Sequence, residues 1–239
     1  MTTTAAKSTT ITEENLLGLP DPVQRHLRQA GVPGTPWITE VTVEQEGVFR
    51  LAPEREYAPI TARQTYRVDR PEFEWKARLK MSPVMTVRGV DRLTNGEGFM
   101  QMRLYGIIPV MTARGEKLNQ GALTRYLSEM IWFPQAFLAD FISWEAIDEH
   151  HAKAILTAPT MAVSGIFEFD DEGRFVTFTT ERYYNDGEKD CMLPWNTPAA
   201  SYGELGGLQL PVRGKAIWTF EDGSEFEYID ITITKIEYR

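Results

Sequence analysis

Apolar and polar residues alternate in short runs along most of this chain, and the alternation breaks once. The alternating blocks cover residues 37–105 and 143–238, and Gly, Pro, Asn and Asp separate the runs within them. Such alternation is typical of strands that bury one face and expose the other. Between the blocks, residues 119–132 carry apolar residues at helical spacing, and Pro134 follows them. The pattern predicts one large antiparallel sheet with a single helical insertion.

A short helix is predicted before the sheet. Pro22 suits a first helical turn, Val23, Leu27 and Ala30 share one face, and Gly31 marks the end. We expect this helix to close one end of the sheet.

The predicted fold is mainly β: a strongly curved antiparallel sheet, or unclosed half-barrel, with an N-terminal helix and a mid-chain helical lid. A sheet of this size has to curve, and its concave face has to cover something. We expect one β domain over residues 13–239, with the helical insertion near residues 117–138. Residues 1–12 are predicted to be a disordered tail.

The charge balance argues against polyanionic partners. The net charge is −9 and the pI is near 5.0, whereas nucleic acids and anionic membranes are bound through clusters of Lys and Arg. The densest basic grouping is Lys76, Arg78, Lys80 and Arg88, which has the alternation of a strand's wet face. We therefore expect no nucleic-acid partner.

Cysteine usage and hydropathy favour the cytoplasm. Cys191 is the single cysteine, so no intrachain disulfide can form. Residues 1–12 lack the apolar core of a secretory signal, and no apolar run is long enough for a transmembrane helix. We expect a cytoplasmic protein without integral membrane association.

A scattered set of Trp, Pro, Tyr and Arg residues gives the chain a recognisable signature. Its members are Leu19-Pro20, Pro22-Val23, Arg25, Arg125-Tyr126-Leu127, Glu129-Met130, Trp132-Phe133-Pro134, Trp144, Arg182-Tyr183, Pro194-Trp195, Tyr202, Pro211, Ala216, Trp218 and Glu237-Tyr238. The set resembles a family of uncharacterised bacterial proteins known as a domain of unknown function. The resemblance covers about residue 16 to the end and implies no activity.

The order of elements is more loosely similar to the bacterial lipoprotein-carrier fold. In that fold an unclosed, curved sheet binds acyl chains on its concave face, beneath a helical lid inserted mid-chain. The likeness implies a shape, and it leaves binding and catalysis both open, because some proteins of that shape act as enzymes. In contrast to the carriers, this protein is expected to have no export signal, which argues against a periplasmic trafficking role.

The predicted mid-chain helix carries one pair of opposite charges, Arg125 and Glu129, spaced i, i+4. One interpretation is a surface ion pair that contributes a few tenths of a kcal/mol. The other places both residues, with Trp132, at the mouth of a cavity, where Glu129 accepts a proton and Arg125 clamps an anion.

Arg182 and Tyr183 are neighbours on a predicted strand, so their side chains point to opposite sides. Arg182 shares a partly apolar face, and a lone buried charge is costly. Glu129, Glu168 or Asp190 could supply its partner in a structural ion pair. Alternatively, Arg182 binds the carboxylate or phosphate head of a ligand.

Histidines and metal motifs give weaker signals. His150 and His151 are adjacent and face opposite ways on a strand, which is a poor metal pair. His151, near Asp148 and Glu149, is the better candidate for a general acid or base. No zinc or phosphate-loop motif is present, so we predict no metal and no cofactor.

Aromatic and Met residues are numerous enough to line a pocket. The ligand-binding candidates are Arg125, Trp132, Met100, Met102, Phe167, Trp195 and Trp218. A packed core is the alternative for each of them. We prefer a cavity because a large half-barrel is hard to fill with its own side chains.

Three functions are compatible with these observations. The first is the binding of a hydrophobic or amphipathic small molecule in the concave face. The second is a cofactor-independent isomerase, cyclase or hydrolase that uses the same cavity, with Glu129, His151, Arg182 and Tyr183 as candidate catalytic residues. The third is a protein-interaction module with a broad exposed apolar patch. The oligomeric state stays open.

Overall fold

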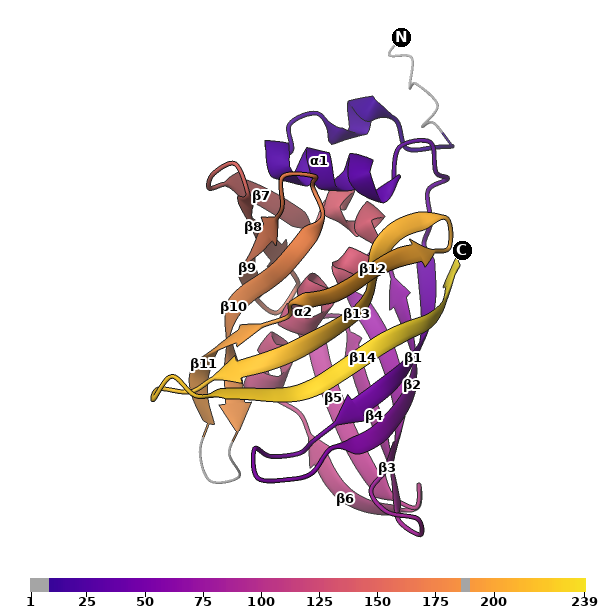
Figure 1. Ribbon diagram of the computed structural model, residues 1–239, viewed down its shortest axis with the longest axis vertical. Coiled ribbons are helices and arrows are strands. Elements are labelled where there is room, and N and C mark those ends of the chain that lie inside the picture. The colour runs from indigo at the N-terminus through magenta and orange to yellow at the C-terminus, as the bar shows by residue number, and fades with distance from the viewer. Residues whose placement is uncertain (1–8, 186–189) are drawn as a thin grey trace.

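A computed structural model describes residues 9–185 and 190–239 of the chain (Figure 1). The helices are η1 (Glu13–Leu16), α1 (Asp21–Ala30), α2 (Glu116–Glu129), η2 (Met130–Trp132) and η3 (Pro134–Leu138). The strands are β1 (Glu40–Phe49), β2 (Ala58–Arg67), β3 (Glu72–Lys80), β4 (Thr86–Thr94), β5 (Glu97–Leu104), β6 (Ile108–Ala113), β7 (Ile142–Ala146), β8 (His151–Thr157), β9 (Ala162–Phe169), β10 (Phe175–Asn185), β11 (Asp190–Asn196), β12 (Ala199–Leu205), β13 (Leu208–Thr219) and β14 (Glu225–Tyr238).

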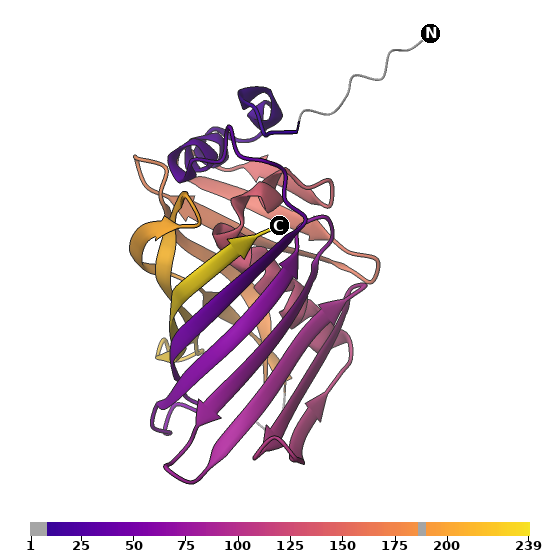
Figure 2. The ribbon, with the colours of Figure 1, turned by 90° about the vertical axis from the view of Figure 1, so that its right-hand side faces the viewer.

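The described strands form one antiparallel sheet of fourteen strands. Thirteen of them follow the order β6-β5-β4-β3-β2-β1-β14-β13-β11-β10-β9-β8-β7, and β12 pairs with β13 beside this path. One half is the meander β1 to β6, which Figure 2 shows from outside, and the other is the meander β7 to β11. The two long strands β13 and β14 join the halves, and β6 and β7 are the two edges. The predicted unclosed half-barrel is confirmed.

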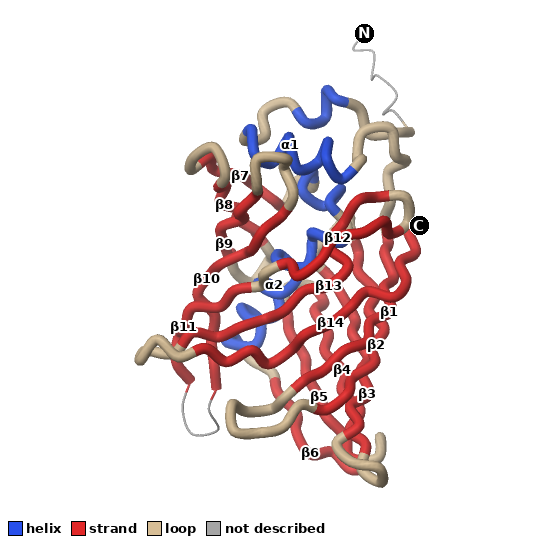
Figure 3. Tube along the Cα trace, in the orientation of Figure 1, coloured by secondary structure: helices blue, strands red, loops and turns tan. Residues whose placement is uncertain are grey.

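The longest helix, α2, lies within the concavity of the sheet. It contacts β4 and β5 on one half and β8, β9 and β10 on the other, and Figure 3 shows it surrounded by strands. From Gly121 to Glu129 every residue except Arg125 is buried. The predicted helix therefore exists, but it fills the concave face from within instead of lying over its mouth.

Aromatic residues fill the part of the concavity that lies next to α1. Phe137 of η3 contacts Phe167 on β9, and Phe167 also contacts Phe178 on β10, with ring centroids 4.9–5.3 Å apart. The helix α1 closes this end, and its buried His26 packs on Phe169. All the described buried apolar residues except Ala58 belong to one cluster. This end of the half-barrel is thus packed shut by its own side chains.

Several local predictions can be compared with the structure. Asn95 and Gly96 form the hairpin turn between β4 and β5, and both have the positive φ (53° and 79°) that such a turn needs. The helix α2 begins three residues before the predicted start and ends in 3₁₀ turns. Strand β6 lies outside the alternating blocks and was not predicted, and no separate strand was predicted for β11, which carries Cys191.

The chain packs against the domain before residue 13, where the predicted tail was expected to end. Residues 1–8 of the predicted tail lie outside the described residues. Ile11, however, is buried, and its backbone exchanges hydrogen bonds with Thr35 and Gly34. Among the described residues, no helix is long and apolar enough to cross a membrane.

Candidate functional site

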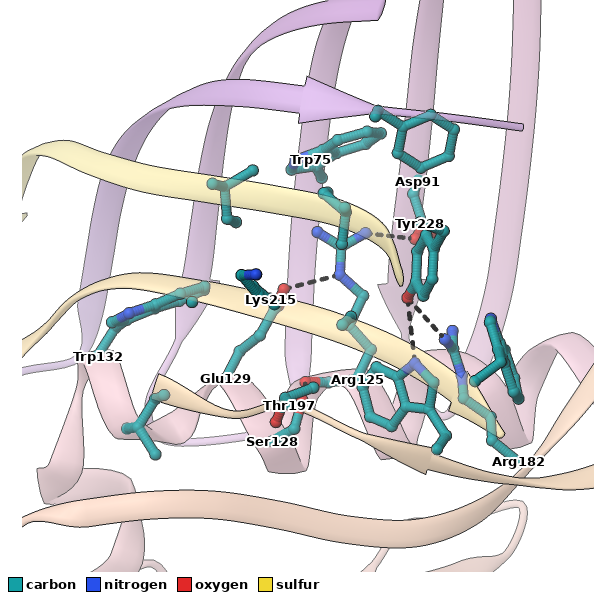
Figure 4. Close-up of a pocket in the computed structure, with 18 of the residues that line it drawn as sticks. Trp75, Asp91, Arg125, Ser128, Glu129, Trp132, Arg182, Thr197, Lys215 and Tyr228 are labelled. Carbon is teal, nitrogen blue, oxygen red and sulfur yellow. Dashed lines mark hydrogen bonds and ion pairs between the residues drawn. The ribbon is translucent and has the colours of Figure 1, made fainter. Parts of the chain in front are cut away.

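A cavity of about 230 Å³ lies between α2 and both halves of the sheet (Figure 4). Its walls are mainly aromatic and aliphatic: they include Phe49, Trp75, Met100, Met102, Ile131, Trp132, Trp195, Pro211, Trp218, Tyr228, Ile229 and Ile231. Four charged side chains, Asp91, Arg125, Glu129 and Arg182, also line it, together with Lys215. An apolar cavity with a few polar groups is the usual form of a small-molecule site.

Arg125 is the centre of a buried polar network. Its guanidinium donates from Nε to Glu129 Oε1 at 2.9 Å and from Nη1 to Asp91 Oδ2 at 2.8 Å. The remaining nitrogen, Nη2, donates to Gln64 Oε1 at 2.9 Å. Burial alone lowers the pKa of Arg125, but Glu129 and Asp91 outweigh it, so the pKa lies above its ordinary value. Three of the five N–H groups of Arg125 are thus engaged, and two carboxylates already neutralise its charge, so an additional anion would gain little there.

Glu129 is equally well satisfied. Its second oxygen, Oε2, accepts hydrogen bonds from Gln64 Nε2 at 2.9 Å and from the Tyr66 hydroxyl at 3.1 Å. Burial, and then the neighbouring carboxylate, raises the pKa of Tyr66 well above its usual value, so this phenol stays a donor. The ion pair between Arg125 and Glu129 is a buried structural element, and the surface-pair interpretation is wrong.

Asp91 differs from Glu129 in having an unused oxygen. Its side chain is only 3% exposed, and its Oδ1 has no hydrogen-bond partner among the described residues. Two carboxylates thus share the single guanidinium of Arg125. A buried acceptor without a partner is costly, so it needs an explanation, and a catalytic or ligand-binding role is one of those that apply.

Arg182 of β10 enters the cavity from the opposite half of the sheet. Its guanidinium carbon lies 4.8 Å from the ring centre of Trp195 and 5.6 Å from that of Trp218. Its hydrogen bonds go to neutral groups, from Nε to the Gly121 carbonyl at 3.2 Å and from Nη1 to the Tyr228 hydroxyl at 3.5 Å. No described carboxylate forms an ion pair with Arg182. Of the partners expected for it, Glu129 bonds Arg125 and Asp190 bonds Lys117 at 2.7 Å. The cation is held in place by aromatic rings without being neutralised.

Two neighbouring groups help to fix Arg182. Gly121 of α2 lets the guanidinium approach the helix backbone, since a Cβ at this position would lie 3.3 Å from its nitrogens. The Tyr228 hydroxyl also accepts a hydrogen bond from Trp195 Nε1 at 3.2 Å. Lys215, the other cation of this wall, is paired with Glu227 at 2.8 Å. Among the cations that line the cavity, Arg182 is the one available to an anion.

The structure brings most of the sequence-predicted site residues to this cavity. Those that line it are Arg125, Glu129, Trp132, Met100, Met102, Arg182, Trp195 and Trp218. Arg182 shares the inward face of β10 with Phe178, in line with the partly apolar face predicted for it. Val176 lies on the outer face, because a bulge shifts the register of β10.

Three predicted residues do not reach the cavity. His151 lies on the outer face of β8, where its Nδ1 is 2.8 Å from Asp148 and the side chain is 36% exposed. Tyr183 points outward beside Lys117. Phe167 is part of the packed aromatic cluster near α1. A general acid–base role for His151 and Tyr183 in this cavity, and ligand contact by Phe167, are therefore wrong.

Sequence reasoning missed the partners of the ion pair. Gln64, Tyr66 and Asp91 all lie on buried faces of their strands. The sequence did contain a signal for them. Polar residues recur on strand faces that the alternation predicts to be buried, and buried polar residues need polar partners. As for metals, the described residues contain no group of three or more His, Cys, Asp or Glu side chains that could hold an ion.

Sequence comparison assigns the chain to a family. A family model described as a family of unknown function, DUF6544, matches residues 9–231. The chain belongs to DUF6544. This confirms the resemblance that the sequence signature predicted. No curated protein sequence matches the chain.

Three solved structures of other proteins resemble this chain in their backbone fold. One is described as an outer membrane lipoprotein-sorting protein domain from Vibrio parahaemolyticus, with 10% identity, a TM-score of 0.46, and coverage of 84% of this chain and 86% of that one. A DUF1329 family protein from Desulfovibrio piger has 7% identity, a TM-score of 0.48 and 91% coverage of both chains. A β-barrel-like protein of DUF1849 from Brucella abortus has 8% identity, a TM-score of 0.33 and coverage of 84% and 98%. Identities this low say nothing about a ligand.

Proposed function

We propose that the cavity of this protein binds one amphipathic small molecule, with its apolar body between the Trp and Met side chains and its anionic head at Arg182. The observation that carries the proposal is a buried apolar cavity with a cation that no described carboxylate neutralises. A carboxylate or phosphate there would gain charge-assisted hydrogen bonds, while the chain displaces water from apolar walls.

The structure distinguishes between the two arginines that line the cavity. Arg125 already satisfies two carboxylates and an amide, so an anion beside it would meet net negative charge. Arg182 has neutral hydrogen-bond partners and aromatic rings around it. The head group therefore belongs at Arg182, and the Asp91–Arg125–Glu129 side repels it.

The size of the cavity favours a single-chain ligand. Its volume of about 230 Å³ is below the range of about 300–1,000 Å³ usual for drug-sized ligands. A medium-length fatty acid or a small cyclic acid fits that space better than a lipid with two acyl chains.

A head-group series tests this proposal. Isothermal titration calorimetry would compare dodecanoate, dodecanol and dodecylammonium on the wild type and on Arg182→Gln, with Arg174→Gln as a control, since Arg174 is exposed and bonds Asp170 in a distant turn. We expect dodecanoate to bind best, and Arg182→Gln to weaken it by about tenfold or more, as for a lost hydrogen bond to a charged group. Equal binding of all three amphiphiles, or no effect of Arg182→Gln, would refute the anionic-head assignment.

A second candidate function is proton transfer within the same cavity, which the free oxygen of Asp91 favours. Glu129 is less suited to act as a base, because its oxygens accept three hydrogen bonds. Asp91 Oδ1 keeps a lone pair in a largely apolar setting. Incubating the protein with a bound acid in D₂O tests this: deuterium uptake by the ligand that Asp91→Asn abolishes would support an enzyme, and no uptake would leave binding alone.

A further inference from the structure

The end of the half-barrel opposite α1 exposes an apolar rim. We use this name for Leu51 in the β1–β2 loop, Val84 in the β3–β4 turn, Ile107 in the β5–β6 turn, and Ile108 and Val110 on β6, whose exposed fractions are 51–81%. Figures 1 and 2 both show these turns at the end away from α1. Apolar side chains that gather on adjacent turns mark a contact surface more often than chance exposure does.

A row of arginines crosses the outer face of the sheet beside this rim. Arg78 on β3 lies opposite Arg88 on β4, and Arg88 lies opposite Arg103 on β5. All three are exposed, and none forms an ion pair with any described residue. Arg103 donates only to the Gln101 side chain, at 2.7 Å. We call Arg78, Arg88 and Arg103 the basic row.

The basic row and the apolar rim are parts of one surface. Each arginine lies within a few residues of a turn that carries a rim residue. At this end the β5–β6 turn is joined to the first residue of β4 by a hydrogen bond from Tyr105 N to Thr86 O at 2.8 Å. Arg88 packs over the β5–β6 turn so closely that a Cβ on Gly106 would lie 2.9 Å from its Cδ.

The basic row is unfavourable for the isolated protein. Like charges directly opposite one another on neighbouring strands destabilise a sheet. The chain as a whole has a net charge of −9, so acids were available to neutralise these positions. The sequence-based expectation that the protein avoids anionic surfaces used the overall charge, and this end of the molecule is a local exception.

We propose that this end of the half-barrel docks on the surface of an anionic lipid bilayer, with the basic row on the head groups and the rim residues inserted below them. Both attractions are needed for stable peripheral binding, and both are present here. A nucleic acid would use the arginines but leave aliphatic rim residues without bases to stack on. A symmetric dimer through this end would bring basic rows of like charge together.

Vesicle sedimentation tests the proposal without requiring a cavity ligand. The full-length protein would be incubated with phosphatidylcholine vesicles, with and without phosphatidylglycerol. We expect sedimentation with the anionic vesicles only, decreasing with salt. Arg88→Ser with Arg103→Ser should weaken the partition coefficient by about fivefold per arginine. Val84→Ser with Ile107→Ser should weaken it similarly by removing insertion.

Matched variants on the other half of the sheet control for net charge and surface hydropathy. Lys153→Ser with Arg174→Ser removes the same charge, and Ile166→Ser with Val176→Ser removes two exposed apolar side chains. These controls should sediment like the wild type, with unchanged circular dichroism. Failure to bind anionic vesicles would overturn the proposal. So would equal loss in the controls, a dimer that dissociates in Val84→Ser with Ile107→Ser, or binding to a single-stranded oligonucleotide in place of vesicles.

Discussion

Two arginines in one cavity have opposite surroundings, and this contrast defines the chemistry of the site. Arg125 holds two carboxylates together with an amide, whereas Arg182 is held by the rings of Trp195 and Trp218 and by neutral oxygens. The first arrangement fixes α2 to the β1–β5 half of the sheet. The second leaves a positive charge facing the cavity, which is the feature that a ligand can use.

The buried network makes a testable contribution to stability. Glu129→Ala would remove the acceptor of Arg125 Nε, of Gln64 Nε2 and of the Tyr66 hydroxyl, so we expect a loss of about 3–5 kcal/mol in the free energy of unfolding. Urea denaturation measures this. Glu145→Ala, which breaks the exposed pair with Lys153, should cost less than about 1 kcal/mol. If the two variants cost the same, Glu129 is not a buried partner of Arg125.

The helix α1 closes its end of the half-barrel with a histidine that is buried in its neutral form. His26 Nδ1 donates to the Gly173 carbonyl at 2.9 Å, while Nε2 has no described partner. Burial lowers the pKa of His26 to about 4, although Gly173 and Asp170 act in the opposite direction. The unfolded chain therefore binds a proton below about pH 6.5, where the folded protein does not.

This difference predicts a stability loss on acidification. Because the unfolded state takes up the extra proton, stability decreases as the pH falls from about 6.5 towards 4. Between pH 7.5 and pH 5, His26 should contribute a loss of about 2 kcal/mol. Urea denaturation of the wild type and of His26→Leu at both pH values isolates this term, and the variant should lose less. His151→Asn, which alters an exposed histidine, should keep the wild-type dependence; identical slopes for all three proteins would contradict the assignment.

The elements differ in how far the sequence could predict them. Strands β2 to β4 and β8 to β10 bury one face and expose the other along most of their length, so their alternation was visible in the sequence. Strand β6 is exposed on both faces and β11 contains Pro194, so neither shows the usual pattern. The helix α2 was predicted by its spacing, but its second, charged face is buried as well. Only the opposing sheet supplies the partners that allow this, and the sequence of the helix does not contain them.

The whole molecule is packed shut at one end of its concavity, and farther along it keeps one cavity beside α2. Phe137, Phe167 and Phe178 fill the part beside α1, and the cavity lies farther from that helix, between Arg182 and Asp91. Composition predicted that aromatic and Met residues would face inward. It could not assign Phe167 to the packed part and Trp195 to the cavity, because that depends on where α2 and η3 lie. The number of aromatic residues therefore indicated that a site exists, but it did not identify which of them line it.

Ligand binding should stabilise the whole fold. A ligand that binds only the folded state, at a hundred times its Kd, adds about 2.7 kcal/mol. For a domain of this size that corresponds to an increase in Tm of roughly 5–10 °C. Differential scanning calorimetry with dodecanoate should show this increase for the wild type and a smaller one for Arg182→Gln. An unchanged Tm at saturating dodecanoate would contradict binding to the folded protein.

The most direct test of the account is a crystal structure of the protein with dodecanoate. The account predicts the alkyl chain between the Trp and Met side chains of the cavity, and the carboxylate at hydrogen-bond distance from the Arg182 guanidinium. A chain bound outside the cavity, or a carboxylate turned towards Arg125 and Asp91, would contradict it.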